Sequence, residues 1–283
     1  MEVPLKLFLI LIPFISLSSL LFAQRVQLQL SAGNGFADGG IPISSYDRSD
    51  AAGPDGIYIT TTQNVHDKYY DVGEGFRIES RVILFFEDNI GCFAQYSHSS
   101  GNETGKTTYS EDNSTGVNTS TINFNSSSVQ GGLHYQTGEG LLQPFGGLGA
   151  GYFFHRKFTL SNESAGESSS SYVEQQLTTN SPVGYVAYLG LNISPVPVLS
   201  LFVEAKATLV TYYVTRTEIT AYRYNGINQL GSLNTNERIT VYEENKSYST
   251  GSQSDVNLPA NGGPPNPVPA NTISITAGIS IRL

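Results

Sequence analysis

The segment from Ile273 to Leu283, ISITAGISIRL, alternates strictly between apolar and polar side chains. Odd positions carry Ile, Ala or Leu, and even positions carry Ser, Thr, Gly or Arg. A period of two places these two sets on opposite faces of one β-strand. The strand therefore needs an apolar environment along one side, which either a second sheet or lipid can supply.

The N-terminus has the pattern of an export signal. Lys6 precedes a largely apolar stretch from Leu7 to Phe22, and Ala23 is a small residue suited to cleavage. We predict a cleaved signal peptide over residues 1–23 and a mature domain over residues 24–283. An N-terminal membrane helix is the alternative, but the apolar stretch is shorter than the roughly 20 residues that a span needs, and Pro13 interrupts it.

Composition narrows the possible partners. Charged residues make up 14% of the chain, and the formal net charge is −9. Because phosphate binding needs clustered Lys and Arg, this balance argues against a nucleic-acid partner. Cys92 is the single cysteine, which excludes an internal disulfide. The remainder is rich in Ser, Thr, Asn, Gly and Tyr, a composition poor in helix formers.

Further segments have the character of strands. They are residues 26–32, 73–86, 90–98, 121–135, 142–155 and 182–193, and a segment that begins at Leu199. Short turns alternate with long polar stretches, such as 99–119 and 161–171, which we expect to be external loops. Since unpaired backbone groups in hydrocarbon are costly, a sheet in lipid must close. We predict an all-β fold: an eight-stranded antiparallel up-and-down transmembrane β-barrel with long extracellular loops, located in the bacterial outer membrane.

The last long connection contains more strand-forming sequence. Residues 237–248 are β-rich and face the stretch 214–224 across Asn225, Gly226 and a polar turn. No short return turn follows, so we interpret the pair as a hairpin that continues above the membrane. A ten-stranded barrel, in which this pair enters the ring, is the alternative.

Two of the strands resemble a known family. Residues 144–152, PFGGLGAGY, resemble the Pro-aromatic-x-Gly-x-Gly-x-Gly-aromatic strand of small outer-membrane barrels of the OmpA and OmpX type. Residues 201–206, LFVEAK, are similar to the strand of that family that carries an inward acidic residue. The resemblance extends over nearly the whole mature chain and implies a fold more than an activity. The chain departs from it in ending on Leu283, where many such proteins end on an aromatic residue.

Charged side chains are predicted to meet inside the barrel. Eight strands enclose an interior just wide enough for side chains to fill. Counted from the short turns, Arg81 and Glu204 lie at similar depth, with Arg77, Glu79 and Lys206 close in height. Unpaired charges in a narrow lumen would be strongly disfavoured, so opposite charges should neutralise one another. We interpret the cluster as a structural plug, and a gated ion or proton path is the alternative.

Without Trp, anchoring at the membrane interfaces must rely on Tyr and Phe. Six such residues lie near predicted strand ends, where they could form the girdle or fill the lumen: Tyr96, Tyr152, Phe154, Tyr188, Tyr212 and Tyr213.

The sequence predicts no catalytic, cofactor-binding or metal site. His66 and His155 could lie near Ser residues at the rim, as an outer-membrane enzyme would require, but Ser is too abundant for this to be informative. Asp47, Asp50 and Asp55 lack the spacing of a calcium loop.

The predicted function is therefore a structural or surface-interaction role through external loops at about residues 38–72 and 219–270. A small channel or transport protein is the second hypothesis, and an outer-membrane enzyme is the third. The expected partners are outer-membrane lipid and lipopolysaccharide, the barrel assembly machinery during biogenesis, and an unidentified surface or host ligand. We expect a monomer without a cofactor or a nucleic-acid partner.

Overall fold

The computed structural model describes most of the chain. The described residues are 25–37, 41–42, 69–70, 75–111, 114–137, 140–166, 169–243, 260–261 and 266–283. The predicted signal peptide lies outside these ranges. In the described part, no helix is both long enough and apolar enough to cross a membrane.

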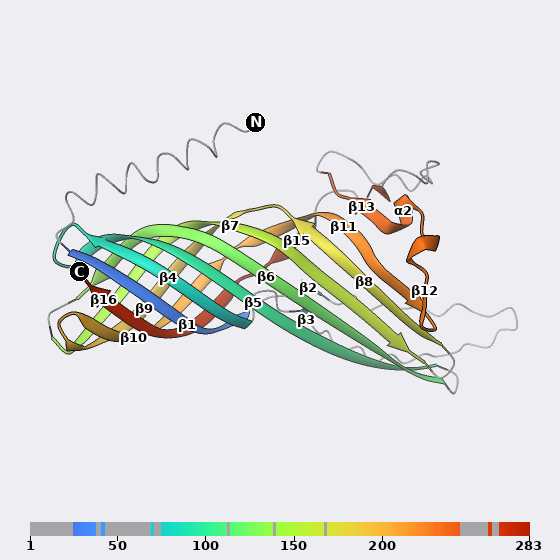
Figure 1. The fold of residues 1–283 in the computed structure, drawn as a ribbon, viewed down its shortest axis with the longest axis horizontal. Coiled ribbons are helices and arrows are strands. Elements are labelled where there is room, and N and C mark those ends of the chain that lie inside the picture. Colours follow the sequence, from blue (N-terminus) through green and yellow to red (C-terminus); the bar gives the residue numbers. More distant parts are fainter. Residues whose placement is uncertain are drawn as a thin grey trace, which may run out of the picture.

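Eight strands form a closed antiparallel ring (Figure 1). They are β1 (Arg25–Ala37), β4 (Gly75–Phe85), β5 (Ile90–Glu111), β6 (Ser114–Gln136), β7 (Leu142–Ala165), β9 (Val183–Val196), β10 (Leu199–Leu209) and β16 (Thr272–Arg282). Each strand pairs with its neighbour in this order, and β1 pairs with β16 to close the ring. The eight-stranded barrel is confirmed, and the ten-stranded alternative is wrong.

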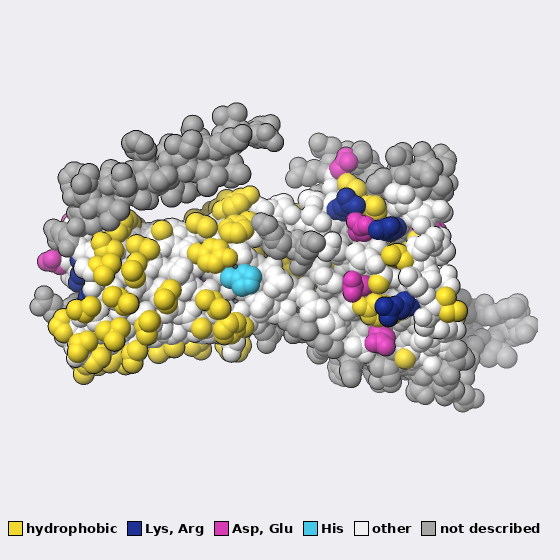
Figure 2. Space-filling model, viewed as in Figure 1, with side chains coloured by type: hydrophobic (Ala, Val, Ile, Leu, Met, Phe, Trp, Pro, Cys, Tyr) yellow, Lys and Arg dark blue, Asp and Glu magenta, His cyan; other side chains and the backbone are white. Residues whose placement is uncertain are grey.

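The final strand has the alternation that its sequence predicts. Ile273 and Ile275 are 55% and 54% exposed, whereas Ser274 is fully buried and Thr276 is 1% exposed. The apolar set therefore lies on the outer wall and the polar set faces the lumen. Figure 2 shows apolar side chains covering the barrel half of the molecule. An apolar outer band around a closed antiparallel sheet is the architecture of a transmembrane β-barrel.

Short turns lie together at one end of the barrel, close to the C-terminus (Figure 1). They connect β4 to β5, β6 to β7 and β9 to β10. We call this the turn end, and the opposite end the extension end.

The strands β5, β6 and β7 continue far beyond the apolar band at the extension end. They contain 22, 23 and 24 residues, whereas about 10 suffice for a transmembrane strand. Their outer parts pair with each other and with β8 (Ser170–Thr179), which pairs with β11 (Thr211–Tyr224). We call this sheet the extension.

The expectation that the long polar stretches are loops is wrong. Residues 99–119 and 161–171, expected to be loops, lie largely in strands β5 to β8. Backbone pairing outside the membrane requires no apolar face, and Thr and Tyr favour strands even where no period of two is visible. The predicted hairpin above the membrane is present in part, because β11 pairs with β13 (Ile239–Val241), while residues 244–248 lie outside the described part.

The remaining elements are short. They are β2 (Ile41–Pro42), β3 (Tyr69–Tyr70), β12 (Ile227–Asn228), β14 (Ala260–Asn261), β15 (Asn266–Pro269), the 3-10 helix η1 (Leu230–Ser232) and the helix α2 (Thr235–Arg238). β15 pairs with the start of β11 and directly precedes β16, so it connects the extension to the barrel.

Candidate functional site

The barrel lumen is the candidate site. Strand alternation directs every second side chain into it, and many of these side chains are polar. Arg77, Glu79 and Arg81 follow one another at a spacing of two on β4, and all three are buried. Glu204 and Lys206 do the same on β10. The structure thus brings all five charged residues singled out from the sequence into one cluster, which we call the lumen cluster.

Arg81 and Glu204 form the strongest contact of the lumen cluster. The two terminal nitrogens of Arg81 donate to the two carboxylate oxygens of Glu204 at 2.6 and 2.8 Å. Arg81 also donates to the side-chain oxygens of Gln95, at 2.7 Å, and Gln29, at 2.9 Å. Its guanidinium carbon lies 3.9 Å from the centre of the Tyr188 ring. This planar, bidentate geometry is the arrangement in which a buried arginine pair is best satisfied.

Glu79 is the second carboxylate of the lumen cluster, and it has several donors. Lys206 donates to its Oε1 atom, and Ser97 donates to the same atom at 3.1 Å. Arg77 lies farther away, with Nη1 at 3.9 Å from Oε1. Arg77 donates instead to the hydroxyls of Ser274 and Thr272, at 3.3 and 3.2 Å. Glu79 is therefore engaged mainly by Lys206, and Arg77 mainly by neutral groups.

Uncharged polar side chains surround the lumen cluster and were not among the predicted site residues. Seven amides are buried in the lumen: Gln27, Gln29, Gln95, Gln130, Gln136, Gln143 and Asn192. The signal for them was present, because they occupy the inward positions of strands whose other positions are mostly apolar. On the turn-end side of the lumen cluster, His134 shares a 2.9 Å hydrogen bond with the Tyr188 hydroxyl.

Aromatic rings fill the turn-end half of the lumen. Phe93, Phe145 and His134 contact the ring of Tyr188, and Phe145 packs edge-on against Phe202. Glycines of β7 provide the space, because a Cβ atom at Gly147 would lie 2.4 Å from the Tyr188 ring. The lumen at this level is therefore occupied by side chains.

The structure divides the aromatic residues considered for a girdle between the outer wall and the lumen. Tyr188 and Tyr212 are each only 2% exposed and belong to the lumen. Tyr96, Tyr152 and Tyr213 are exposed on the outer wall, as a girdle requires. In the segments 183–188 and 209–214 both faces of the strand are mostly apolar or aromatic, so the sequence period does not separate inward from outward rings.

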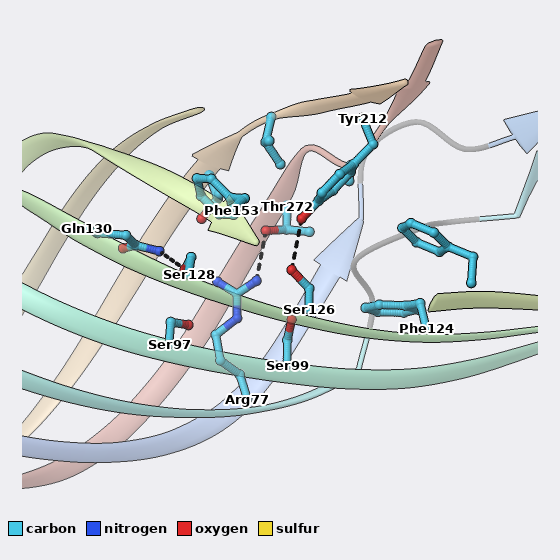
Figure 3. Close-up of a pocket in the computed structure, with 14 residues that line it drawn as sticks. Arg77, Ser97, Ser99, Phe124, Ser126, Ser128, Gln130, Phe153, Tyr212 and Thr272 are labelled. Carbon is cyan, nitrogen blue, oxygen red and sulfur yellow. Dashed lines mark hydrogen bonds between the residues drawn. The ribbon is translucent and has the colours of Figure 1, made fainter. Parts of the chain in front are cut away.

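A small cavity lies on the extension side of the lumen cluster (Figure 3). Its volume is about 30 Å³. Its walls carry the guanidinium of Arg77, the hydroxyls of Ser97, Ser126, Thr208 and Thr272, and the ring of Tyr212. We call it the Arg77 cavity.

The histidines considered for an enzyme are not tested by the structure. His66 lies outside the described residues, and so does the side chain of His155. Within the described part of the chain, no group of three or more His, Cys, Asp or Glu residues is placed to hold a metal ion.

Comparisons with known proteins find similar structures at low sequence identity. Neisserial surface protein A (NspA) is 9% identical, with 90% of this chain and 96% of that chain covered and a TM-score of 0.36. Ail, the attachment invasion locus protein of Yersinia pestis, solved in complex with the heparin analogue sucrose octasulfate, is 11% identical, with 92% and 97% covered and a TM-score of 0.33. These TM-scores support no transfer of function, and the fold assignment rests on the strand pairing described above.

No family model matches the sequence, and no curated protein matches it.

Proposed function

We propose that the chain is a surface-interaction protein of the bacterial outer membrane, in which a filled barrel anchors the extension outside the cell. The observation that carries this proposal is the length of β5, β6 and β7, which is about twice what a membrane crossing needs. Strands of this length place a paired, folded sheet outside the lipid. A pore would need an open lumen instead.

The surface of the extension supports the proposal. Exposed large apolar side chains are concentrated on the barrel, whereas the extension carries mainly polar and charged groups (Figure 2). Glu218 links Arg216 and Arg238 through contacts of 2.9 and 2.8 Å. Surfaces rich in Tyr, Ser, Asn and Gly make adaptable polar contacts with protein or glycan ligands.

One tyrosine of the extension is held as a hydrogen-bond donor. The Tyr172 hydroxyl donates to Glu174 at 3.0 Å. Partial burial, together with this hydrogen bond, raises the pKa of Tyr172. The hydroxyl therefore stays protonated to a higher pH than an ordinary tyrosine, and Glu174 also accepts from Thr220 at 2.7 Å. These contacts fix part of the exposed face of β8 and β11 before any ligand arrives.

Further elements of the proposal follow from the architecture. An apolar outer wall suits the lipid and lipopolysaccharide of an outer membrane, and we propose that the barrel assembly machinery inserts the chain. Because the ring is complete within one chain, we propose that a monomer is the functional unit. The ligand of the extension is a protein or glycan of another surface.

Shortening the extension should abolish surface binding and leave the barrel intact. In the test variant, residues 103–122 are replaced by Asn-Gly, a two-residue hairpin turn. This joins Asn102 to Asn123, which are paired across β5 and β6. Labelled nanodiscs that carry the intact or the shortened chain are applied to an array of glycans and extracellular-matrix proteins. We expect the intact chain to retain at least one probe that empty nanodiscs do not, and the shortened chain to lose it.

The control is the folded state of the shortened chain, shown by migration that changes on boiling in SDS gels. A closed barrel has no free edge in lipid from which to unravel, so the shortened barrel should keep this behaviour. Equal binding of the intact and the shortened chain to every probe, with both folded, would contradict a role for the extension.

A further inference from the structure

The lumen cluster carries an excess positive charge. Among the buried side chains of the described residues, three cations, Arg77, Arg81 and Lys206, face two carboxylates, Glu79 and Glu204. Arg81 pairs with Glu204, and Lys206 pairs with Glu79. Arg77 is left with a 3.9 Å approach to an oxygen that Lys206 and Ser97 already occupy. An isolated buried charge is strongly disfavoured unless a counter-charge compensates it.

Arg77 and the cavity beside it have unused hydrogen-bonding capacity. The Nε atom of Arg77 and the hydroxyl of Thr208 are two of the buried polar atoms that have no hydrogen-bond partner in the described part of the chain. Both residues line the Arg77 cavity, and Figure 3 shows the guanidinium of Arg77 at its edge, between Thr272 and Ser97. A buried donor without a partner calls for an explanation, and a bound water or ion is one of the explanations that fits a polar cavity.

The size and the walls of the cavity restrict what can occupy it. About 30 Å³ holds about two or three water molecules, since one needs roughly 10–15 Å³. A monatomic anion fits this space. Phe124, Phe153 and Phe158 belong to the apolar part of the wall, which favours a weakly hydrated ion.

We propose that Arg77 and the Arg77 cavity bind one small monovalent inorganic anion, with chloride and bromide as the probes. Arg77 supplies the charge, and the hydroxyls of Ser126, Thr208 and Thr272 supply neutral donors around it. The anion neutralises the cation that the two carboxylates leave uncompensated. The site is then a constituent of the plug, because it completes the charge balance of the lumen without any further acidic residue.

Chloride-35 NMR of the folded full-length chain in a non-ionic detergent tests the site. Bound chloride relaxes fast, so exchange with a protein site broadens the signal of free chloride. We expect broadening by the unaltered chain that bromide reverses by competition. Arg77→Gln should reduce the broadening to that of protein-free micelles, whereas Arg216→Gln, which removes an exposed arginine of the extension, should leave it unchanged.

A second measurement covers the case in which Arg77→Gln does not fold. Thr208→Val removes one neutral donor and keeps the charge, so it should reduce the chloride broadening. At constant ionic strength, replacing gluconate by bromide should raise the folded-to-unfolded ratio of the unaltered chain by a factor of about 11 at ten times the dissociation constant.

Two results would overturn the proposal. Chloride broadening that is the same in the unaltered chain, Arg77→Gln and Thr208→Val would show that halide binds elsewhere. Absence of any broadening and of any difference between bromide and gluconate would show that Arg77 is compensated by Glu79 and water alone.

Discussion

Glu204→Ala is expected to lower the free energy of unfolding by about 3–5 kcal/mol, the usual loss when one partner of a buried ion pair is removed. Glu204 is 1% exposed and accepts two hydrogen bonds from Arg81. Without the carboxylate, the guanidinium of Arg81 remains buried with only neutral acceptors, from Gln29 and Gln95. Urea titration of the refolded chain in lipid vesicles, followed by the fraction of the folded band on unboiled gels, measures the change.

A double-mutant cycle separates the ion pair from general damage to the lumen. Replacing Arg81 by Met together with Glu204→Ala should recover part of the loss, because no unpaired charge is then left. Glu218→Ala is the matched control, since Glu218 pairs with Arg216 and Arg238 on the extension, and exposed pairs contribute about 0–1 kcal/mol. Additive effects of the two lumen substitutions would mean that Arg81 and Glu204 do not stabilise each other.

Ala277→Arg should destabilise the barrel by about 2–4 kcal/mol, the penalty for arginine on the lipid face near the bilayer midplane. Ala277 lies between Ile275 and Ile279 on the outer wall, near the middle of β16. Its cross-strand neighbours are Ala32 and Val203, so its surroundings are apolar. The same urea titration in vesicles gives the difference from the unaltered chain.

The control for this substitution is Leu283→Arg, at the turn end of the barrel, where Leu283 is 74% exposed. Arginine near an interface costs only about 0–1 kcal/mol, because its head group reaches water. If Ala277→Arg and Leu283→Arg cost the same, the outer wall is not immersed in hydrocarbon at Ala277. Gly278 is unsuitable as a control, because even a Cβ atom there would lie 2.0 Å from the Leu30 carbonyl oxygen.

The parts of the fold that the sequence predicts are those where the two faces of a strand differ. Ile275 and Thr276 are assigned to the outer wall and the lumen by the period of two alone, since a shift of one residue would move every side chain to the wrong face. The same reasoning brings Arg81 and Glu204 to one depth, because each is counted from a short turn at the turn end. The fold and the contents of the lumen cluster follow from this.

Where the two faces of a strand are alike, the period of two does not show which side chains face the lumen. Tyr188 and Tyr185 lie in a stretch that is apolar on both sides, and only the pairing of β9 with β7 and β10 directs Tyr188 inward. Residues 99–119 are polar on both sides, so neither a loop nor a strand is favoured by periodicity. Their pairing depends on β6 continuing beside β5, which is a property of the assembled sheet.

Which cation of the lumen cluster carries the excess charge is decided only in the folded barrel. The alternation of β4 and β10 predicts which residues form the lumen cluster. It does not predict which of the three cations lacks a carboxylate partner. In the structure, Lys206 reaches Glu79 and Arg81 reaches Glu204, so the excess falls on Arg77 beside a cavity. The candidate anion site therefore follows from the geometry and not from any motif.

Single-channel recording in planar bilayers tests most directly whether the lumen is filled. The purified chain is refolded, shown to be folded by its unboiled migration, and inserted into a bilayer under applied voltage. We expect no discrete conductance steps from the unaltered chain, because the lumen cluster and the ring of Tyr188 occupy the lumen. Reproducible steps from the unaltered, folded chain would contradict the filled barrel and favour a channel function.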